Sequence, residues 1–235
     1  MLRFHTQVAG VSLTAQQPLN NIARVTIQAL AAVCGGTQSL HTNSYDEALG
    51  LPTEASATVA LRTQQIIAEE SGAADVVDPL GGSYHVERLT LLMIEEVKQE
   101  LERIASKGGA LKAVEAGYQQ REIHKAAFAH QRALETGERS IVGVNVHMMD
   151  ESTSPPVQTI DADLARAQEA RLNNVREQRN GERTNRALAD LERVAGTEEN
   201  IFPLVLEAVR AEATVGEICG VLRKVFGEYT PPSGF

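Results

Sequence analysis

The chain has 235 residues, of which 43% are hydrophobic and 23% charged, a composition typical of a globular protein with one large domain or two small ones. Its net charge of -9 argues against nucleic-acid binding, and no apolar run approaches the roughly 20 residues that cross a bilayer. Two distant cysteines, Cys34 and Cys219, form no disulfide framework or metal cluster, which favours the cytoplasm.

The first 88 residues predict two successive β/α units. The first unit has a short strand at 2–7 and a helix at 20–34, and the second has a strand at 37–42 and a helix at 53–70. A repeat 36 residues apart supports this reading: Phe4-His5-Thr6-Gln7 and Leu40-His41-Thr42-Asn43. The period fits one strand–helix unit of a parallel barrel or open sheet, and two units cannot close a barrel.

The rest of the chain is predicted to be mostly helical. An amphipathic helix at 89–104 follows a turn-rich segment at 78–84. Further helices are expected at 110–116, 118–136, 162–179, 184–195, 200–211 and 214–226. The last of them opens with a capping box between Thr214 and Glu217. We also expect a strand at Ser140–Asn145 and an exposed linker at 151–156.

Polar residues lie at the carboxyl ends of both predicted strands and in the loop after the second. They are His5, Thr6 and Gln7 at the first strand, and Ser39, His41, Thr42, Asn43, Asp46 and Glu47 at the second strand and its loop. The carboxyl ends of parallel strands share one edge of a sheet, so these side chains can surround a ligand, and Gly10 permits close approach. Alternatively, they only cap helices and satisfy loop backbone groups. The histidine spacings predict no metal site, and no nucleophile elbow or phosphate-binding loop occurs.

Six blocks of sequence, spread along essentially the whole chain, stand in the same order as in one known protein family. They are Leu2–Gly10, Leu13–Pro18, Gly36–Asn43, Asp46–Thr53, Asp78–Tyr84 and Ala213–Ile218. Together they resemble the large (catalytic) subunit of the methylmalonyl-CoA mutases. The resemblance implies an α/β fold in which residues 1–88 form the last two β/α units of a parallel eight-stranded TIM-type barrel. A helical extension with one strand (89–150) and a helical C-terminal segment (151–235), without a cobalamin-binding domain, would follow.

The resemblance implies an isomerase that interconverts methylmalonyl-CoA and succinyl-CoA by radical chemistry with adenosylcobalamin. The implied cofactor-binding residues are Gln7, Gly10, Glu47, Gly50 and Leu51, with His5 as a further contact beside them. Gln38 and Ser39 match positions near the acyl-CoA substrate. Some relatives carry alanine at Gly50. The family's catalytic residues and its cobalt-ligating Asp-x-His-x-x-Gly signature are missing, so we expect no catalytic or metal-ligating residue here.

Three interpretations remain open at this point. The chain is a fragment of a large subunit that starts at an internal methionine and is inactive alone, or it is a natural short subunit that completes a barrel with another chain. Either would need the rest of the barrel and a separate cobalamin-binding small subunit that ligates the cobalt. The third interpretation is a non-catalytic mutase remnant that acts as a binding or assembly protein. Isobutyryl-, 2-hydroxyisobutyryl- and ethylmalonyl-CoA are alternative substrates, but the blocks resemble methylmalonyl-CoA mutases most closely.

Overall fold

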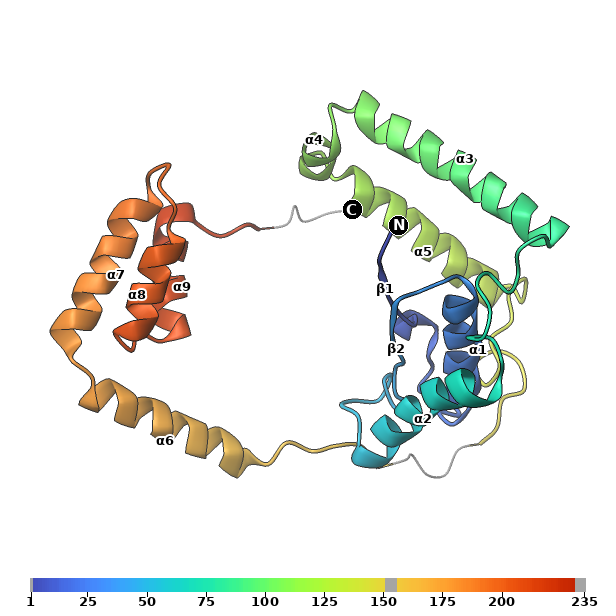
Figure 1. The fold of residues 1–235 in the computed structure, drawn as a ribbon, viewed down its shortest axis with the longest axis horizontal. Coiled ribbons are helices and arrows are strands. Elements are labelled where there is room, and N and C mark those ends of the chain that lie inside the picture. The colour runs from blue at the N-terminus through green and yellow to red at the C-terminus, as the bar shows by residue number, and fades with distance from the viewer. Residues whose placement is uncertain (1, 151–155, 231–235) are drawn as a thin grey trace. The chain divides into compact units, whose positions relative to one another are not determined.

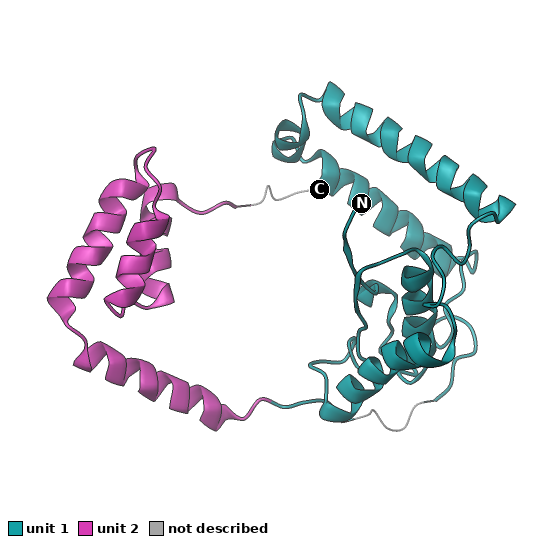
Figure 2. Ribbon diagram, viewed as in Figure 1, with its two compact units in different colours: residues 1–159, 235 teal, residues 160–234 magenta. Residues whose placement is uncertain are grey.

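The computed structural model describes residues 2–150 and 156–230, which belong to two compact units. The first unit spans residues 1–159 and the second residues 160–234; Figures 1 and 2 show their elements. Helices dominate both units, and the described strands are confined to the first. The predicted linker at 151–156 lies almost entirely outside the described residues.

A small parallel sheet organises the first unit. Strand β1 (His5–Gln7) pairs with strand β2 (Ser39–His41), and helices α1 (Asn20–Cys34) and α2 (Glu54–Glu70) follow them in turn. The two predicted β/α units are therefore confirmed, while the sheet holds only these two strands among the described residues. Each strand is shorter than predicted, because backbone hydrogen bonds continue only one residue beyond either end of the pair.

The core of the first unit lies between the sheet and the two helices. Leu40 of β2 and Val8, the residue after β1, pack with Val25 and Ala29 of α1 and with Ile67 of α2. Side chains alternate across a strand, so the residues on either side of Leu40 point away from the helices. One face of the sheet is thereby buried and the other carries polar side chains.

Local capping explains the bounds of the helices. Helix α1 matches the predicted range, and Gly36, with a φ of +79°, turns the chain after it. Thr53 accepts a hydrogen bond from the Ser56 amide at 3.2 Å, so it caps α2 and the helix begins one residue later than predicted. The Thr53 amide in turn donates to Asp46 Oδ2 at 3.2 Å, which connects the cap to the loop after β2.

Helices α3 (Tyr84–Ser106), α4 (Ala110–Glu115) and α5 (Tyr118–Glu135) follow α2 in the first unit, and a short 3-10 helix, η1 (Gly10–Ser12), follows β1. The Tyr118 hydroxyl donates to the Glu100 carboxylate at 2.8 Å and joins α5 to α3. The apolar face predicted for 89–104 is present, but Met93 and Leu101 are 62% and 60% exposed. The described part of the chain therefore leaves this face of α3 uncovered.

The predicted strand at Ser140–Asn145 is wrong. The segment is a turn that contains only an isolated bridge between Val142 and Val146. Two local features bend the chain: Gly143 has a φ of +83°, and Asn145 Oδ1 accepts a hydrogen bond from the Ile141 amide at 2.7 Å. A side chain that satisfies the backbone in this way removes the need for a partner strand.

The second unit is helical throughout its described residues. It contains α6 (Ala162–Gln178), α7 (Gly181–Ala195), α8 (Phe202–Arg210) and α9 (Val215–Phe226). Leu191, Ala208 and Ile218 form the centre of a core shared by α7, α8 and α9. The capping box predicted between Thr214 and Glu217 is confirmed at the start of α9.

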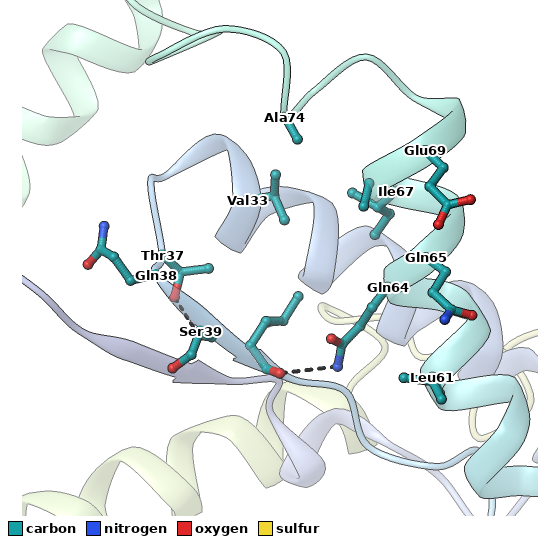
Figure 3. A pocket seen from close by; sticks show the side chains of 12 residues that line it. Val33, Thr37, Gln38, Ser39, Leu61, Gln64, Gln65, Ile67, Glu69 and Ala74 are labelled. Atoms are coloured by element: carbon teal, nitrogen blue, oxygen red, sulfur yellow. Dashed lines mark hydrogen bonds between the residues drawn. The ribbon is translucent and has the colours of Figure 1, made fainter.

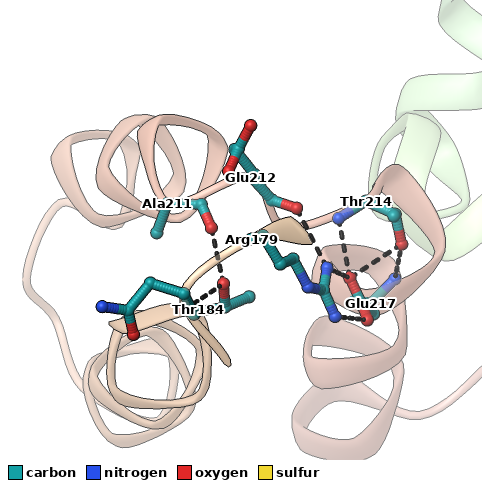
Figure 4. Close-up of polar contacts among 7 residues, drawn as sticks. Arg179, Thr184, Ala211, Glu212, Thr214 and Glu217 are labelled. Carbon is teal, nitrogen blue, oxygen red and sulfur yellow. Dashed lines mark hydrogen bonds and ion pairs between the residues drawn. The ribbon is translucent and has the colours of Figure 1, made fainter. Parts of the chain in front are cut away.

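A paired arginine and glutamate connect the segment after α6 to α9 (Figure 4). Arg179 donates from Nη1 and Nη2 to the two carboxylate oxygens of Glu217 at 2.7 and 2.6 Å. Arg179 also donates to the Glu212 carbonyl at 2.9 Å, and Thr214 donates to Glu217 from its amide at 2.8 Å. The hydrogen bonds from Arg179, with those from Thr214, lower the pKa of Glu217 to about 2.

Glu217→Gln is expected to lower the free energy of unfolding of the second unit by about 2 kcal/mol at pH 7, because the bidentate ion pair with Arg179 is lost. The folded pKa lies below the ordinary value, so this contribution is complete above about pH 4.5 and disappears as the pH falls toward 2. Hydrogen exchange of the α9 amides measures it. Glu207→Gln, which removes an exposed pair with Arg210, is the matched control and should change the free energy by less than about 0.5 kcal/mol.

Candidate functional site

Four polar side chains lie on the side of the sheet that faces away from α1 and α2. We call them the polar face: His5 and Gln7 on β1, and Ser39 and His41 on β2. The alternation of the strands places them there, because Leu40 between Ser39 and His41 packs toward the helices. All four are exposed in the described chain. The strand register sets His5 beside Ser39 and Gln7 beside His41.

Hydrogen bonds between side chains define two ends of the polar face. At the amino end of the strands, His5 Nδ1 and Ser39 Oγ are 2.7 Å apart. At the carboxyl end, Gln7 Nε2 donates to Oδ1 of Asn43, just beyond β2, at 3.1 Å. His41 lies between Ser39 and Asn43 along the chain, so the polar face runs continuously from one end to the other.

Asn43, Gly10 and Glu47 form a close cluster at the carboxyl end. A Cβ atom on residue 10 would lie 2.9 Å from Asn43 Nδ2 and 3.5 Å from Glu47 Oε1, so glycine alone fits without displacing a neighbour. Asn43 is 2% exposed, and its Nδ2 has no hydrogen-bond partner among the described residues. A buried donor without a partner is costly, and the cluster therefore favours a ligand that accepts a hydrogen bond.

One buried asparagine holds both strand-end loops in place. Asn21 of α1 is 0% exposed, and its Nδ2 donates to the carbonyls of Thr14 and Tyr45, each at 2.8 Å. Its Oδ1 accepts from the Thr14 amide at 3.1 Å and from Arg24 Nη1 at 2.7 Å. Thr14 belongs to the loop after β1 and Tyr45 to the loop after β2. Asn21 thus fixes the spacing between Gly10 and the Asn43–Glu47 segment.

Gln38 and Ser39, the predicted substrate residues, lie at the amino end of β2. Gln38 Oε1 accepts a hydrogen bond from the Phe4 amide at 2.9 Å. A cavity of about 310 Å³ opens nearby between β2 and α2 (Figure 3). Its inner walls include Val33, Leu40, Gln64 and Ile67. Gln38 and Ser39 also line this cavity, so it borders the amino end of the polar face.

The predicted residues Gly50 and Leu51 occupy the end of the loop that leads into α2. The Gly50 amide donates to the Asp46 carbonyl at 3.1 Å, and a Cβ at Gly50 would make only an ordinary contact with Val157, at 3.8 Å. Leu51 is 51% exposed. The structure therefore gathers Gln7, Gly10 and Glu47 around Asn43, and it leaves Gly50 and Leu51 at the outer part of the loop.

One residue of the site, Asn21, was not singled out from the sequence. Asn43 was predicted among the polar residues at the end of the second strand, and it continues the alternation of Ser39 and His41. Asn21 lies beside an apolar helix face, and nothing local marks it as buried. Its role becomes visible only when both loops are seen to converge on it.

Gly10→Ala is expected to destabilise the loop after β2 by about 1–3 kcal/mol, because the new Cβ must displace the buried Asn43 amide. Hydrogen exchange of the amides at 43–47 measures the effect as faster exchange. Gly50→Ala is the matched control and should leave these rates nearly unchanged, since its Cβ meets no close atom. Similar rates in the two variants would show that the Gly10 contact does not hold the loop.

The described residues contain no group of three or more His, Cys, Asp or Glu side chains arranged to hold a metal ion. Within the same residues, no helix combines the length and apolar character that crossing a membrane requires. Neither observation bears on the polar face itself.

The parallel β/α arrangement, with polar side chains gathered at the strand ends, is typical of α/β proteins that bind ligands at the carboxyl edge of a sheet. The family model described as methylmalonyl-CoA mutase matches residues 1–228. The chain belongs to the methylmalonyl-CoA mutase family.

Curated relatives agree with this assignment. A probable mitochondrial methylmalonyl-CoA mutase of Caenorhabditis elegans is 46% identical over 97% of this chain and 31% of its own length. A methylmalonyl-CoA mutase of Rhizobium meliloti (strain 1021) is 45% identical over 98% of this chain and 33% of its own length. The 2-hydroxyisobutanoyl-CoA mutase large subunit of Aquincola tertiaricarbonis is 44% identical, with coverages of 97% and 41%. The chain thus spans about a third of the length of the first two relatives and somewhat more of the third.

Proposed function

We propose that this chain is part of an adenosylcobalamin-dependent isomerase that interconverts methylmalonyl-CoA and succinyl-CoA. The observation that carries the proposal is the order of side chains along the polar face. Ser39 of the polar face and its neighbour Gln38, which match the acyl-CoA positions of the family, lie at the amino end of β2. Gln7, Gly10 and Glu47, which match its cofactor positions, lie with Asn43 at the carboxyl end.

The carboxyl-end cluster fits a cobalamin in its chemistry. The cofactor carries amide side chains and ribose hydroxyls, which both donate and accept hydrogen bonds. Asn43 Nδ2 is a buried donor that the described residues leave unpaired, and Glu47 presents an exposed carboxylate as an acceptor. Gly10 removes the one side chain that would block approach to both. Gly50 and Leu51 would contact the outer part of the cofactor.

Adenosylcobalamin, when bound, supplies the carbon radical that takes a hydrogen atom from the substrate. The residues of this chain would bind and orient the two ligands. Asn43 and Glu47 would contact the cofactor, and Asn43 would orient Gln7. His5 and Ser39 would border the acyl-CoA. The packed helices close one side of the sheet against water, which protects reactive species. No residue here is assigned a bond-making role, and the cobalt ligand would come from another domain or subunit.

The polar face needs more polypeptide to become a closed pocket. We propose that residues 1–88 supply two β/α units of a TIM-type barrel, followed by a helical extension (89–150) and a C-terminal segment (151–235). Two features support this: both outer strand edges are unpaired among the described residues, and the polar face is exposed. The rest of the barrel and a cobalamin-binding small subunit would complete it. The words "large subunit" in one relative's name support such an assembly, which we call the complete mutase.

Turnover with a panel of acyl-CoAs tests the proposed function. The complete mutase, captured from its source with an antibody against α7–α9, is incubated with adenosylcobalamin and with methylmalonyl-, ethylmalonyl-, isobutyryl- or 2-hydroxyisobutyryl-CoA. Methylmalonyl-CoA should give the highest rate, with succinyl-CoA as product. A faster reaction with another member would reassign the substrate. Failure with every member, while both ligands still bind, would favour the non-catalytic alternative.

A further inference from the structure

Asp46 joins the loop after β2 to the amino end of α2. It is 0% exposed, and its Oδ2 accepts a hydrogen bond from the Thr53 amide at 3.2 Å. Thr53 caps α2, and the partial positive charge at the amino end of a helix stabilises a carboxylate beside it. The other oxygen, Oδ1, has no partner among the described residues. A buried carboxylate with so little hydrogen bonding is costly, and such costs are typical of functional sites.

The main chain at Asp46 fixes the backbone of Glu47. The peptide group that joins these two residues has both of its polar atoms bonded. Its carbonyl accepts hydrogen bonds from the amides of Leu49 and Gly50, at 2.8 and 3.1 Å, and its amide donates to the Ser44 carbonyl at 3.1 Å. The result is a tight turn around the peptide group, and the Asp46 side chain anchors that turn to α2.

The Glu47 carboxylate depends on this turn for its position. Glu47 is exposed, and no described residue forms a hydrogen bond or an ion pair with its carboxylate. A Cβ atom on residue 10 would lie 3.5 Å from Glu47 Oε1, so the carboxylate lies beside Gly10, where the proposed function places the cofactor. Because no side chain holds it there, the backbone of Glu47 determines where it points.

We propose that Asp46 is a positioning residue for adenosylcobalamin, which holds Glu47 where its carboxylate contacts the cofactor. The inference rests on the proposed function, which assigns Glu47 to the cofactor end of the polar face. Asp46 is buried and would act through Glu47, without a contact of its own. A loop that is already ordered loses little conformational freedom when a ligand binds, so anchoring the turn strengthens binding.

Substitution of Asp46 in the complete mutase tests this role. Asp46→Ala should weaken adenosylcobalamin binding about five- to tenfold, the effect of one lost hydrogen bond, with the KM for methylmalonyl-CoA unchanged. Asp46→Asn keeps an oxygen acceptor for the Thr53 amide and should restore most of the affinity. Asp161→Ala is the matched control. Asp161 is an exposed aspartate that accepts from the Asp163 amide at 2.8 Å at the start of α6, so neither constant should change.

The double variant, Asp46→Ala with Glu47→Ala, distinguishes positioning from an independent effect. If Asp46 acts through Glu47, the double variant should bind adenosylcobalamin within about twofold of Glu47→Ala alone. Losses that multiply would overturn the inference, because Asp46 would then affect the cofactor without Glu47. The amides of β1 and β2 should keep their wild-type hydrogen exchange in Asp46→Ala. A general loss of protection there would also overturn the inference, in favour of a purely structural role.

The outcomes separate this inference from the proposed function. An unaltered Kd for adenosylcobalamin in Asp46→Ala, in a mutase that is otherwise active, would overturn the inference and leave the proposed function standing. A wild-type complete mutase that binds no adenosylcobalamin would overturn both.

Discussion

Glu47→Ala in the complete mutase is expected to weaken adenosylcobalamin binding by about tenfold to a hundredfold, the range for a hydrogen bond to a charged group. Acyl-CoA binding should change by less than about twofold. The reason is position: the Glu47 carboxylate lies at the carboxyl end of the sheet beside Gly10, whereas Ser39 and His5 mark the amino end. Equilibrium dialysis with adenosylcobalamin and calorimetric titration with methylmalonyl-CoA measure the two affinities separately.

The control for this experiment is Glu54→Ala. Glu54 is an exposed carboxylate in the first turn of α2, seven positions farther along the chain, and no part of the polar face includes it. Its removal should leave both affinities unchanged. Equal losses of cofactor and acyl-CoA binding in Glu47→Ala, or no loss of either, would contradict the assignment of separate ends to the two ligands.

Asn21→Ala is expected to destabilise both strand-end loops by about 3 kcal/mol, because the Thr14 and Tyr45 carbonyls lose their donor inside the protein. Amides at 43–47 should then exchange about a hundredfold faster with solvent, since each 1.4 kcal/mol is about a factor of ten. Hydrogen exchange followed by mass spectrometry or NMR measures this directly on the chain. The loop after β1 should show a parallel increase.

Asn20→Ala provides the comparison from the adjacent position. Asn20 donates one side-chain hydrogen bond, to Gln17 Oε1 at 2.8 Å, and it is only partly buried. We expect its removal to cost less than about 1 kcal/mol. If Asn21→Ala exchanged no faster than Asn20→Ala at 43–47, Asn21 would not be the residue that fixes the two loops.

Helices were predictable from the sequence because their signals are local. The range 20–34 for α1 matches the structure, and the Thr214–Glu217 capping box lies where it was predicted. Apolar spacing and capping residues act within one or two turns of the helix, so a short window of sequence contains the information. The strand predicted at Ser140–Asn145 failed for the opposite reason. A strand needs a distant partner, and here the side chain of Asn145 satisfies the backbone instead.

The candidate site was only partly predictable. Gln7, Gly10 and Glu47 come together as neighbours of Asn43, which follows from the 36-residue repeat and the parallel pairing of the strands. The burial of Asn21 could not be predicted, because it depends on two loops that meet only in the folded chain. The missing partner of Asn43 Nδ2 is likewise a property of three-dimensional packing. It is the feature of the site that favours a ligand able to accept a hydrogen bond.

The central claim is that one continuous polar face brings an acyl-CoA and a cobalamin together. Isotope transfer tests it most directly. The complete mutase is incubated with adenosylcobalamin and methylmalonyl-CoA deuterated in its methyl group, and the recovered cofactor is analysed by mass spectrometry. We predict that deuterium appears at the 5′ carbon of the adenosyl group while labelled succinyl-CoA forms. Turnover without deuterium in the cofactor would contradict the account, because substrate and cofactor would then not meet on this face.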